Sequence, residues 1–404
     1  MSYAPRRRFS RPKRNFNPRK RFGGNTRRGP KKESIHPSKF IQKATPATEH
    51  THQTQHAFGD FPLAKTLAGN LVRRKFSSPS PIQDQTILPA LEGRDIIGIA
   101  DTGTGKTLAF SLPVLHKLIM DKKSHALIIA PTRELAEQIL TECKKLIEGE
   151  RLRYALLIGG MPMYKQLKEL SGRPQLVIGT PGRIKDHLDR ETISLRFFNL
   201  FVLDEVDRML DMGFVRDIRT IMSRLAPVRQ SFFFSATMVP KVRTLIDEFS
   251  NDPLFVSVKT GNTSDQVEQN IVHYSSAEDK WKKLTAILEA NAPEKMLIFE
   301  ETKRGANTLG KKLLAQGFSA DAIHGNKSQP QRKRILDKFR TGKTRILVAT
   351  DVAARGIDVA DIAYVINYAT PQSYSDYVHR IGRAGRAGKQ GFALTFLPSR
   401  ESRR

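Results

Sequence analysis

A glycine-rich segment that follows an apolar run constrains this chain more than any other feature of its sequence. Residues 100–107 read Ala-Asp-Thr-Gly-Thr-Gly-Lys-Thr and come directly after the run that ends at Ile99. A strand that stops at a glycine-rich turn and enters a helix at Lys-Thr is the layout of a phosphate-binding loop. The N–H groups of the turn and the positive end of the helix dipole attract phosphate. The segment therefore predicts an α/β domain that binds a nucleotide.

The residue types of this loop suggest separate roles. Lys106 is placed to reach the β- and γ-phosphates, and the Thr107 hydroxyl is placed to face Mg²⁺. The usual pattern begins with Gly, whereas this chain has Ala100, but Gly103 and Gly105 keep the backbone tight. A chance loop rich in glycine and lysine is the alternative interpretation. The predicted nucleotide contacts of the loop are Thr102, Gly103, Thr104, Gly105, Lys106 and Thr107.

The 404 residues carry a strong positive charge, with 68 Lys and Arg against 40 Asp and Glu and a net charge of +28. A cationic surface favours a polyanionic partner such as nucleic acid, and an anionic membrane is the competing partner. No apolar run reaches the roughly 18 residues that a membrane span needs, and we expect no signal peptide. The single Cys143 excludes an internal disulfide and a cysteine-based zinc site. These features predict a cytoplasmic protein with no membrane partner.

The first 50 residues differ from the rest in composition. They hold 15 Lys and Arg residues against Glu33 and Glu49, and they lack apolar periodicity. We expect this segment to be a disordered basic tail, because it cannot bury a core. Its aromatic residues lie among the arginines, which favours loose binding to single-stranded nucleic acid, and a solubilising tail is the alternative. These aromatic residues are Tyr3, Phe9, Phe16 and Phe22.

From about residue 55, short apolar runs alternate with helical patterns, which indicates buried parallel sheets. The fold class is therefore α/β, with two tandem domains, each a mostly parallel sheet flanked by helices. A polar stretch with turn chemistry separates two series of runs. The predicted divisions are a tail at 1–50, a first domain at 51–254, a linker at 255–266, a second domain at 267–397 and a tail at 398–404.

A cluster of carboxylates follows one of these apolar runs. Leu200–Leu203 is followed by Asp204, Glu205 and Asp207. At the carboxyl end of a parallel strand such groups face the ligand crevice. Asp204 is predicted to hold Mg²⁺, and Glu205 is predicted to orient or deprotonate the attacking water. An acidic helix N-terminus is the alternative interpretation.

The second domain contains arginines that small residues separate. His379, Arg383 and Arg386 lie in the segment His-Arg-Ile-Gly-Arg-Ala-Gly-Arg. Arginine supplied across a cleft to a phosphate loop stabilises the charge of the transition state. Arg383 and Arg386 are therefore predicted to be catalytic, together with Lys106 and the carboxylates, and a basic surface loop is the alternative. Asp358 is a weaker candidate for the ribose hydroxyls.

Together these residues resemble the DEAD-box family of ATP-dependent RNA helicases, most like bacterial members, over nearly all of residues 58–397. The resemblance implies two RecA-like domains that bind ATP with Mg²⁺. It also implies that Phe58 and Gln83 read adenine. The resemblance further implies that Asp207, Ser235, Thr237 and His379 couple ATP hydrolysis to domain closure.

RNA contacts follow from the same resemblance. Hydroxyls, exposed N–H groups and guanidiniums on loops bind phosphate and the 2′-hydroxyl without reading bases. The resemblance therefore implies RNA binding with little sequence preference. The implied residues are Pro131, Thr132, Arg133, Gly160, Gln166, Thr180, Gly182, Arg183, Thr302, Lys303, Arg332 and Thr350. Departures from the family pattern are Lys75, where Gly is usual, Val206, where Ala is usual, and the pair Glu300 and Glu301, where the family often has a neutral or polar pair.

The resulting hypothesis is an RNA-dependent ATPase that unwinds short duplexes or remodels ribonucleoprotein complexes. We expect a monomer, with ribosomal or RNA-decay proteins as partners. Two alternatives stay open: a translocating DNA helicase or repair ATPase, and an RNA clamp in which the basic tail dominates. The adenine-reading pair, Phe58 and Gln83, argues against the first alternative.

Overall fold

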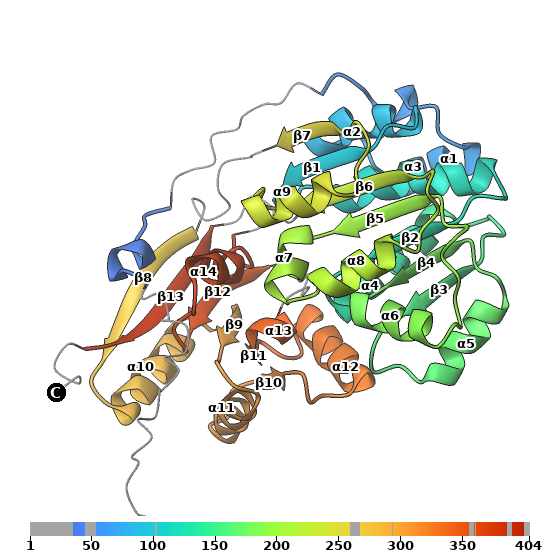
Figure 1. The fold of residues 1–404 in the computed structure, drawn as a ribbon. Helices are drawn as coiled ribbons and strands as arrows, with labels where there is room; N and C mark the ends of the chain where they lie inside the picture. Colours follow the sequence, from blue (N-terminus) through green and yellow to red (C-terminus); the bar gives the residue numbers. More distant parts are fainter. Residues whose placement is uncertain are drawn as a thin grey trace, which may run out of the picture.

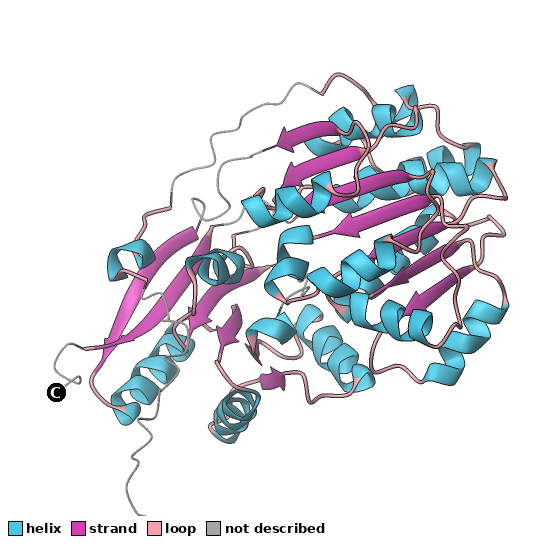
Figure 2. Cartoon of the chain, in the orientation of Figure 1, coloured by secondary structure: helices cyan, strands magenta, loops and turns pink. Residues whose placement is uncertain are grey.

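The computed structural model describes residues 35–44, 54–101, 103–258, 267–292, 294–354, 359, 361–385 and 390–399. These residues form two α/β domains, each built around one sheet (Figure 1). We call residues 54–258 the front domain and residues 267–399 the rear domain. Helices lie on both faces of each sheet (Figure 2). The predicted fold class is confirmed.

The front sheet has seven strands in the order β3-β4-β2-β5-β6-β1-β7, and its pairings are parallel. The carboxyl ends of its strands therefore meet at one edge. Its strands are β1 (Ile96–Ala100), β2 (Ala126–Ile129), β3 (Tyr154–Leu157), β4 (Leu176–Gly179), β5 (Leu200–Asp204), β6 (Gln230–Ser235) and β7 (Leu254–Val258). Its helices are η2 (Phe58–Asp60), α1 (Lys65–Arg73), α2 (Pro81–Leu91), α3 (Lys106–Met120), α4 (Arg133–Leu146), α5 (Met163–Ser171), α6 (Pro181–Asp189), α7 (Val206–Asp211), α8 (Val215–Met222) and α9 (Pro240–Asp247).

The rear sheet has six strands in the order β10-β11-β9-β12-β13-β8, again paired in parallel. Its strands are β8 (Val267–Tyr274), β9 (Lys295–Phe299), β10 (Ala320–Ile323), β11 (Ile346–Ala349), β12 (Ile362–Asn367) and β13 (Gly391–Pro398). Its helices are α10 (Ala277–Ala290), α11 (Lys303–Ala315), α12 (Gln329–Arg340), α13 (Asp351–Ala354) and α14 (Tyr374–Ile381).

Each sheet separates two apolar cores. In the front domain, Phe110 lies in one core and Phe201 in the other. In the rear domain, Phe339 and Leu284 occupy the two corresponding cores. The central strands are apolar at successive positions because both faces are covered, which is why these runs could be recognised in the sequence.

The structure moves the predicted end of the first domain. Residues 254–258 were assigned in part to the linker, but they form β7, which pairs with β1 through Gly98 and Val256. The front domain therefore extends to Val258. Residues 259–266 lie outside the described residues, and β8 opens the rear domain at Val267.

The predicted disordered tail is wrong for residues 35–44. This segment contains the short helix η1 (Pro37–Phe40), and Gln42 pairs with Gln269 in an antiparallel bridge on the rear sheet. Residues 1–34, with the aromatic residues interleaved among arginines, and residues 45–53 lie outside the described residues. No helix in the described ranges is long and apolar enough to cross a bilayer.

Candidate functional site

The glycine-rich loop lies at the carboxyl end of β1 and leads into α3. Gly103 and Gly105 have φ angles of +88° and +93°, which lie in a backbone region that residues with a Cβ rarely adopt. Lys106 opens α3 and is buried, and its Nζ donates a hydrogen bond to the Ala100 carbonyl at 2.7 Å. Thr107 follows in the first turn of the same helix. The loop thus combines a helix N-terminus with a buried ammonium group, which suits a phosphate.

Gln83 contacts this loop from α2. Its Nε2 donates to the Gly105 carbonyl at 2.9 Å, and its Oε1 accepts from the Ser80 N–H at 2.9 Å. The amide is therefore oriented by two backbone groups. Phe58 packs edge-on against Phe61 and Phe76, with ring centroids 6.2 and 6.0 Å apart, in the same front core.

The carboxylate cluster begins where β5 ends. Asp204 accepts a hydrogen bond from the Glu205 N–H at 3.0 Å, and Glu205 forms an ion pair with Arg208 one helical turn later. Glu205 has a φ of +57°, in the left-handed region. This strained turn places two neighbouring carboxylates at the edge of the sheet, and both are almost completely buried.

The two carboxylates differ in their electrostatic surroundings. Burial raises the pKa of Asp204 to about 7, against the lowering effect of the Lys106 ammonium. Burial would also raise the pKa of Glu205, but the cations of Arg208, Lys106 and Arg383 outweigh it and hold this pKa below its usual value. Neighbouring carboxyl groups whose pKa values are pushed apart are typical of sites that divide chemical roles between them.

Asp207 connects the carboxylate cluster to the end of β6. Its Oδ2 accepts hydrogen bonds from the Thr237 N–H at 2.9 Å and the Thr237 hydroxyl at 3.0 Å. The Ser235 hydroxyl accepts from the Asp207 N–H at 3.3 Å and donates to the Thr237 carbonyl at 2.8 Å. Any displacement of the cluster must therefore move the loop after β6 as well.

Rear-domain side chains approach the cluster from across the cleft. Arg383 is buried and lowers the pKa of Glu205 by its charge. His379 lines a small pocket together with Arg208 and Arg383, and burial together with the Arg208 cation lowers its pKa. Arg380 is fixed by Asp351 through two hydrogen bonds of 2.6 and 2.7 Å. The predicted residues Asp358 and Arg386, and Thr102 of the loop, lie outside the described residues.

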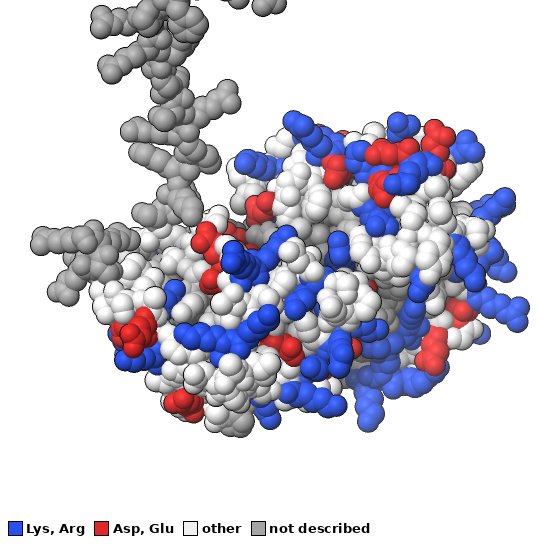
Figure 3. Space-filling view, turned by 90° about the horizontal axis from the view of Figure 1, so that it is seen from below, with Lys and Arg blue, Asp and Glu red and all other residues white. Residues whose placement is uncertain are grey.

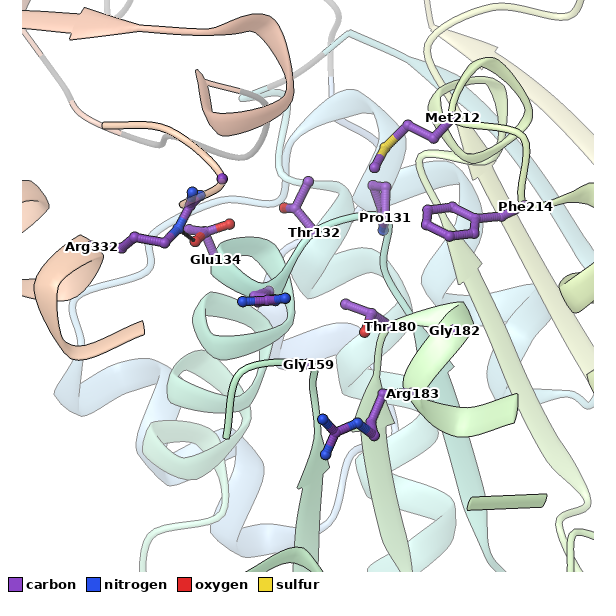
Figure 4. Close-up of a pocket in the computed structure, with 12 residues that line it drawn as sticks. Pro131, Thr132, Glu134, Gly159, Thr180, Gly182, Arg183, Met212, Phe214 and Arg332 are labelled. Atoms are coloured by element: carbon purple, nitrogen blue, oxygen red, sulfur yellow. Dashed lines mark hydrogen bonds and ion pairs between the residues drawn. The ribbon is translucent and has the colours of Figure 1, made fainter. Parts of the chain in front are cut away.

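A second site lies between the domains, away from the phosphate loop. It is a pocket of about 370 Å³ at the carboxyl ends of several front strands, and the rear domain closes it with Gly325 and Arg332. Figure 4 shows Arg332 and Glu134 pointing toward each other; the Arg332 Nε donates to Glu134 at 2.5 Å. Gln329 donates to Glu137 at 3.1 Å beside this pair. The face of the molecule seen in Figure 3 carries many Lys and Arg side chains and fewer acidic ones.

Comparisons with known proteins agree with this geometry. Residues 80–245 match the family model described as DEAD/DEAH box helicase, and residues 279–388 match the helicase conserved C-terminal domain. The DEAD-box ATP-dependent RNA helicase CshA of Geobacillus kaustophilus is 42% identical over 348 residues, covering 85% of this chain and 74% of the relative. This chain belongs to the DEAD-box family of ATP-dependent RNA helicases.

Further relatives support the assignment. The ATP-dependent RNA helicase CshA of Listeria monocytogenes is 44% identical over 348 residues, which are 85% of this chain and 66% of that relative. The structure of S. cerevisiae Dbp5 bound to RNA and ADP BeF3 aligns with a TM-score of 0.74 and 31% identity, covering 86% of this chain and 90% of that one. Mss116p bound to ssRNA and AMP-PNP aligns with a TM-score of 0.77 and 30% identity, covering 86% and 76%. The two RecA-like domains are therefore confirmed.

In this DEAD-box chain, most of the residues predicted to touch RNA line the interdomain pocket. They are Pro131, Thr132, Arg133, Thr180, Gly182, Arg183 and Arg332. Gly160 lies against the Arg133 guanidinium. Lys303 is near the rim, because a Cβ added at Gly325 would lie 3.2 Å from its Cε. Thr302 is exposed and accepts from the Gly305 N–H, which caps α11, whereas Thr350 is buried at the start of α13.

Gln166 does not face the pocket. It is completely buried, its Nε2 donates to the carbonyls of Ile158 and Met161 at 3.1 and 3.2 Å, and its Oε1 contacts His187 at 3.2 Å. The expected direct RNA contact of Gln166 is therefore corrected. Its side chain instead holds the loop that contains Gly160.

Five residues that line the pocket are absent from the predicted RNA contacts: Glu134, Gly159, Met212, Phe214 and Gly325. Glu134 is the most informative of these, because it forms the buried ion pair with Arg332. It directly follows Arg133, which was recognised, but helix α4 gives no sequence signal that one of its carboxylates pairs with another domain. Met212 and Phe214 lie just after α7 and give the pocket an apolar wall.

Replacing Gly160 with alanine should weaken RNA binding. Gly160 has a φ of +81°, and an added Cβ would collide with the Arg133 guanidinium, which would have to leave its place in the pocket. Loss of one charge-assisted hydrogen bond to phosphate, at about 1.5–3 kcal/mol, corresponds to a tenfold or greater loss of affinity. Fluorescence anisotropy with labelled single-stranded RNA measures the effect. Gly69→Ala, at a glycine with open space, is the matched control, and unchanged RNA affinity in Gly160→Ala would refute the role of Arg133.

Proposed function

We propose that this DEAD-box chain hydrolyses ATP in an RNA-stimulated reaction and uses the resulting domain closure to separate short RNA duplexes or to remodel ribonucleoprotein complexes. The observation that carries the proposal is that both sites contain side chains of both domains. Arg383 lines one small pocket together with Arg208, the ion-pair partner of Glu205, and Arg332 closes the second pocket against Glu134. A ligand in either site therefore favours the same closed arrangement.

The proposed ATP site uses residues that surround the phosphate loop. Gln83 and Phe58 would bind the base, Lys106 would bind the phosphates, and Glu205 would orient the attacking water. Glu205 suits this role because its lowered pKa keeps it ionised at neutral pH. Arg383 would stabilise the negative charge that develops on the transferred phosphoryl group.

The residues present also suit a magnesium ion. In the described part of the chain no cluster of three or more His, Cys, Asp or Glu could hold a metal alone. Mg²⁺, however, is commonly bound by one or two carboxylates together with phosphate oxygens and water. Asp204 and the Thr107 hydroxyl supply such oxygens beside the loop. Mg²⁺ bound there would neutralise phosphate charge during hydrolysis.

The second pocket is proposed to bind single-stranded RNA through its backbone. Thr132, Thr180 and Arg183 are hydroxyl and guanidinium groups that suit phosphates and 2′-hydroxyls. Because one closed state serves both ligands, ATP and RNA should tighten each other's binding by the same factor. We also propose that the protein is a monomer in the cytoplasm. Burial raises the pKa of Cys143 to about 12, so this thiol is unreactive in the folded chain.

The decisive test compares ATP hydrolysis in the presence of RNA and of DNA of one sequence. We expect strong stimulation by RNA and weak stimulation by DNA, since the 2′-hydroxyl distinguishes the two polymers. Equal stimulation would favour a DNA helicase or repair ATPase. A deletion of residues 1–34 tests the RNA-clamp alternative and spares the folded segment 35–44. Strand separation that persists with weaker, less salt-sensitive RNA binding would make the tail an accessory.

A further inference from the structure

Residues 35–44 precede the front domain in the sequence but lie on the rear domain (Figure 1). We call this segment the strap. It lies outside the regions that match the two helicase family models, which begin at residues 80 and 279. Phe40 is its anchor: the side chain is 1% exposed and belongs to a core of the rear domain. Nothing in the ATP site or the second pocket requires such a segment, so its contacts need their own explanation.

The strap contacts one face of α14. The Phe40 ring meets the Tyr377 ring edge-on, with centroids 4.8 Å apart. The Tyr377 hydroxyl donates to the Gln269 side chain at 2.8 Å. Gln269 in turn exchanges two backbone hydrogen bonds with Gln42, at 2.8 and 3.1 Å. Tyr377 is thus enclosed by the strap and by the strand to which the strap is paired.

Arg380, three residues after Tyr377 on a neighbouring face of the helix, gives α14 a second set of contacts. This guanidinium binds Asp351 and donates to the Asn367 side chain at 3.1 Å and to the Ala369 carbonyl at 2.7 Å. Helix α14 has only eight residues, and Arg383 follows two residues after its end. A short helix depends on its side-chain contacts for orientation, and here Tyr377 and Arg380 supply two sets of them.

We propose that Phe40 is a positioning residue for ATP hydrolysis, which acts by packing against Tyr377 and so fixing the direction in which α14 presents Arg383. This inference rests on the proposed function. A group that stabilises transition-state charge must be held within a fraction of an ångström, and a displacement of about 1 Å can lower a rate by roughly 10²-fold. The strap therefore contributes to catalysis without touching ATP or RNA.

Phe40→Ala should lower the kcat of RNA-stimulated ATP hydrolysis by about tenfold and leave the RNA affinity without nucleotide unchanged. Ile41→Ala is the matched control, because Ile41 is the next residue of the strap and is 59% exposed. Phe40→Leu, which keeps an apolar side chain, should recover most of the kcat. Gln42→Pro removes the N–H that pairs with Gln269 and should reproduce the loss from a second position, including where Phe40→Ala folds poorly.

A double-mutant cycle separates positioning from general stabilisation. If Phe40 acts through Arg383, Phe40→Ala should have no further effect on the residual kcat of Arg383→Ala. A tenfold loss in both backgrounds would overturn the proposal, as would full kcat in both Phe40→Ala and Gln42→Pro. Wild-type protein that shows no RNA-stimulated hydrolysis would instead refute the proposed function, so the two failures can be distinguished.

Discussion

Replacing Arg383 with alanine should lower the kcat of RNA-stimulated ATP hydrolysis by roughly 10³- to 10⁵-fold, the range found for arginines supplied across a cleft to a phosphate loop. Arg383 comes from the rear domain, yet its charge lowers the pKa of Glu205 in the front domain. It is also 5% exposed, so its charge acts with little screening by water. Steady-state phosphate release at saturating ATP and RNA measures the loss.

Two further variants sharpen this experiment. Arg383→Lys keeps the charge but not the planar guanidinium, and it should restore little of the activity. Arg340→Ala is the control for loss of a rear-domain arginine, since Arg340 is exposed and pairs only weakly with Asp337 of its own helix, at 3.5 Å. Near-normal kcat in Arg383→Ala would contradict the assignment of a shared ATP site.

Replacing Glu205 with glutamine should reduce ATP hydrolysis by about 10²- to 10⁴-fold, the usual contribution of a general base. ATP binding should survive, because Lys106 and the loop are unchanged. The protein should therefore remain closed and retain RNA as long as ATP is present. Anisotropy of labelled RNA, compared with ATP and with ADP, detects this retention.

The change at Glu205 has one side effect to control. Glutamine removes the charge that pairs with Arg208, so the buried guanidinium loses its ionic partner and some stability is lost. Thermal melting reports that loss separately from activity. Glu248→Gln, which breaks an exposed ion pair with Arg219, should affect neither hydrolysis nor RNA retention. Failure of Glu205→Gln to bind ATP would contradict the role assigned here.

Much of the front domain could be predicted because residues close together in the sequence determine its strands, turns and helices. The apolar run of β1 and the glycines after it specify a strand, a turn and a helix within a dozen residues. Asp204 and Glu205 were recognised in the same way, as polar groups directly after a buried strand. Parallel topology then brings the ends of β1 and β5 to one edge, so local patterns were sufficient to predict a shared site.

What escaped prediction depends on partners distant in the sequence. Strand β8 has glutamate, glutamine and asparagine at three successive positions, followed by half-exposed residues, so it lacks the continuous apolar run of a buried strand. Gln166 was wrongly predicted to contact RNA and Glu134 was missed. Both side chains are buried by partners from other elements, His187 for Gln166 and Arg332 for Glu134. Phe40 was assigned to the disordered tail because the sequence around it is rich in cationic residues and a single aromatic residue does not predict a core. Its partner Tyr377 is distant in the sequence and contacts Phe40 only in the folded chain.

Lys75 shows how a departure from a family pattern is accommodated. The family usually has Gly at this position, and Lys75 takes the left-handed conformation that Gly would favour, with a φ of +58°. A lysine there carries a conformational cost of about 1 kcal/mol or more. Val206, the second departure, is completely buried in a front core, where its extra methyl groups find apolar neighbours.

The pairing of Gln42 with Gln269 has a mechanical consequence. The chain leaves the rear domain just after the first of these residues and returns just before the second, so both connections to the front domain start from one place. Two domains joined by a single linker can rotate freely about it. Because Gln42 and Gln269 are paired, one point on the rear sheet is tied to the front domain twice, and we expect the cleft to widen farthest from that point.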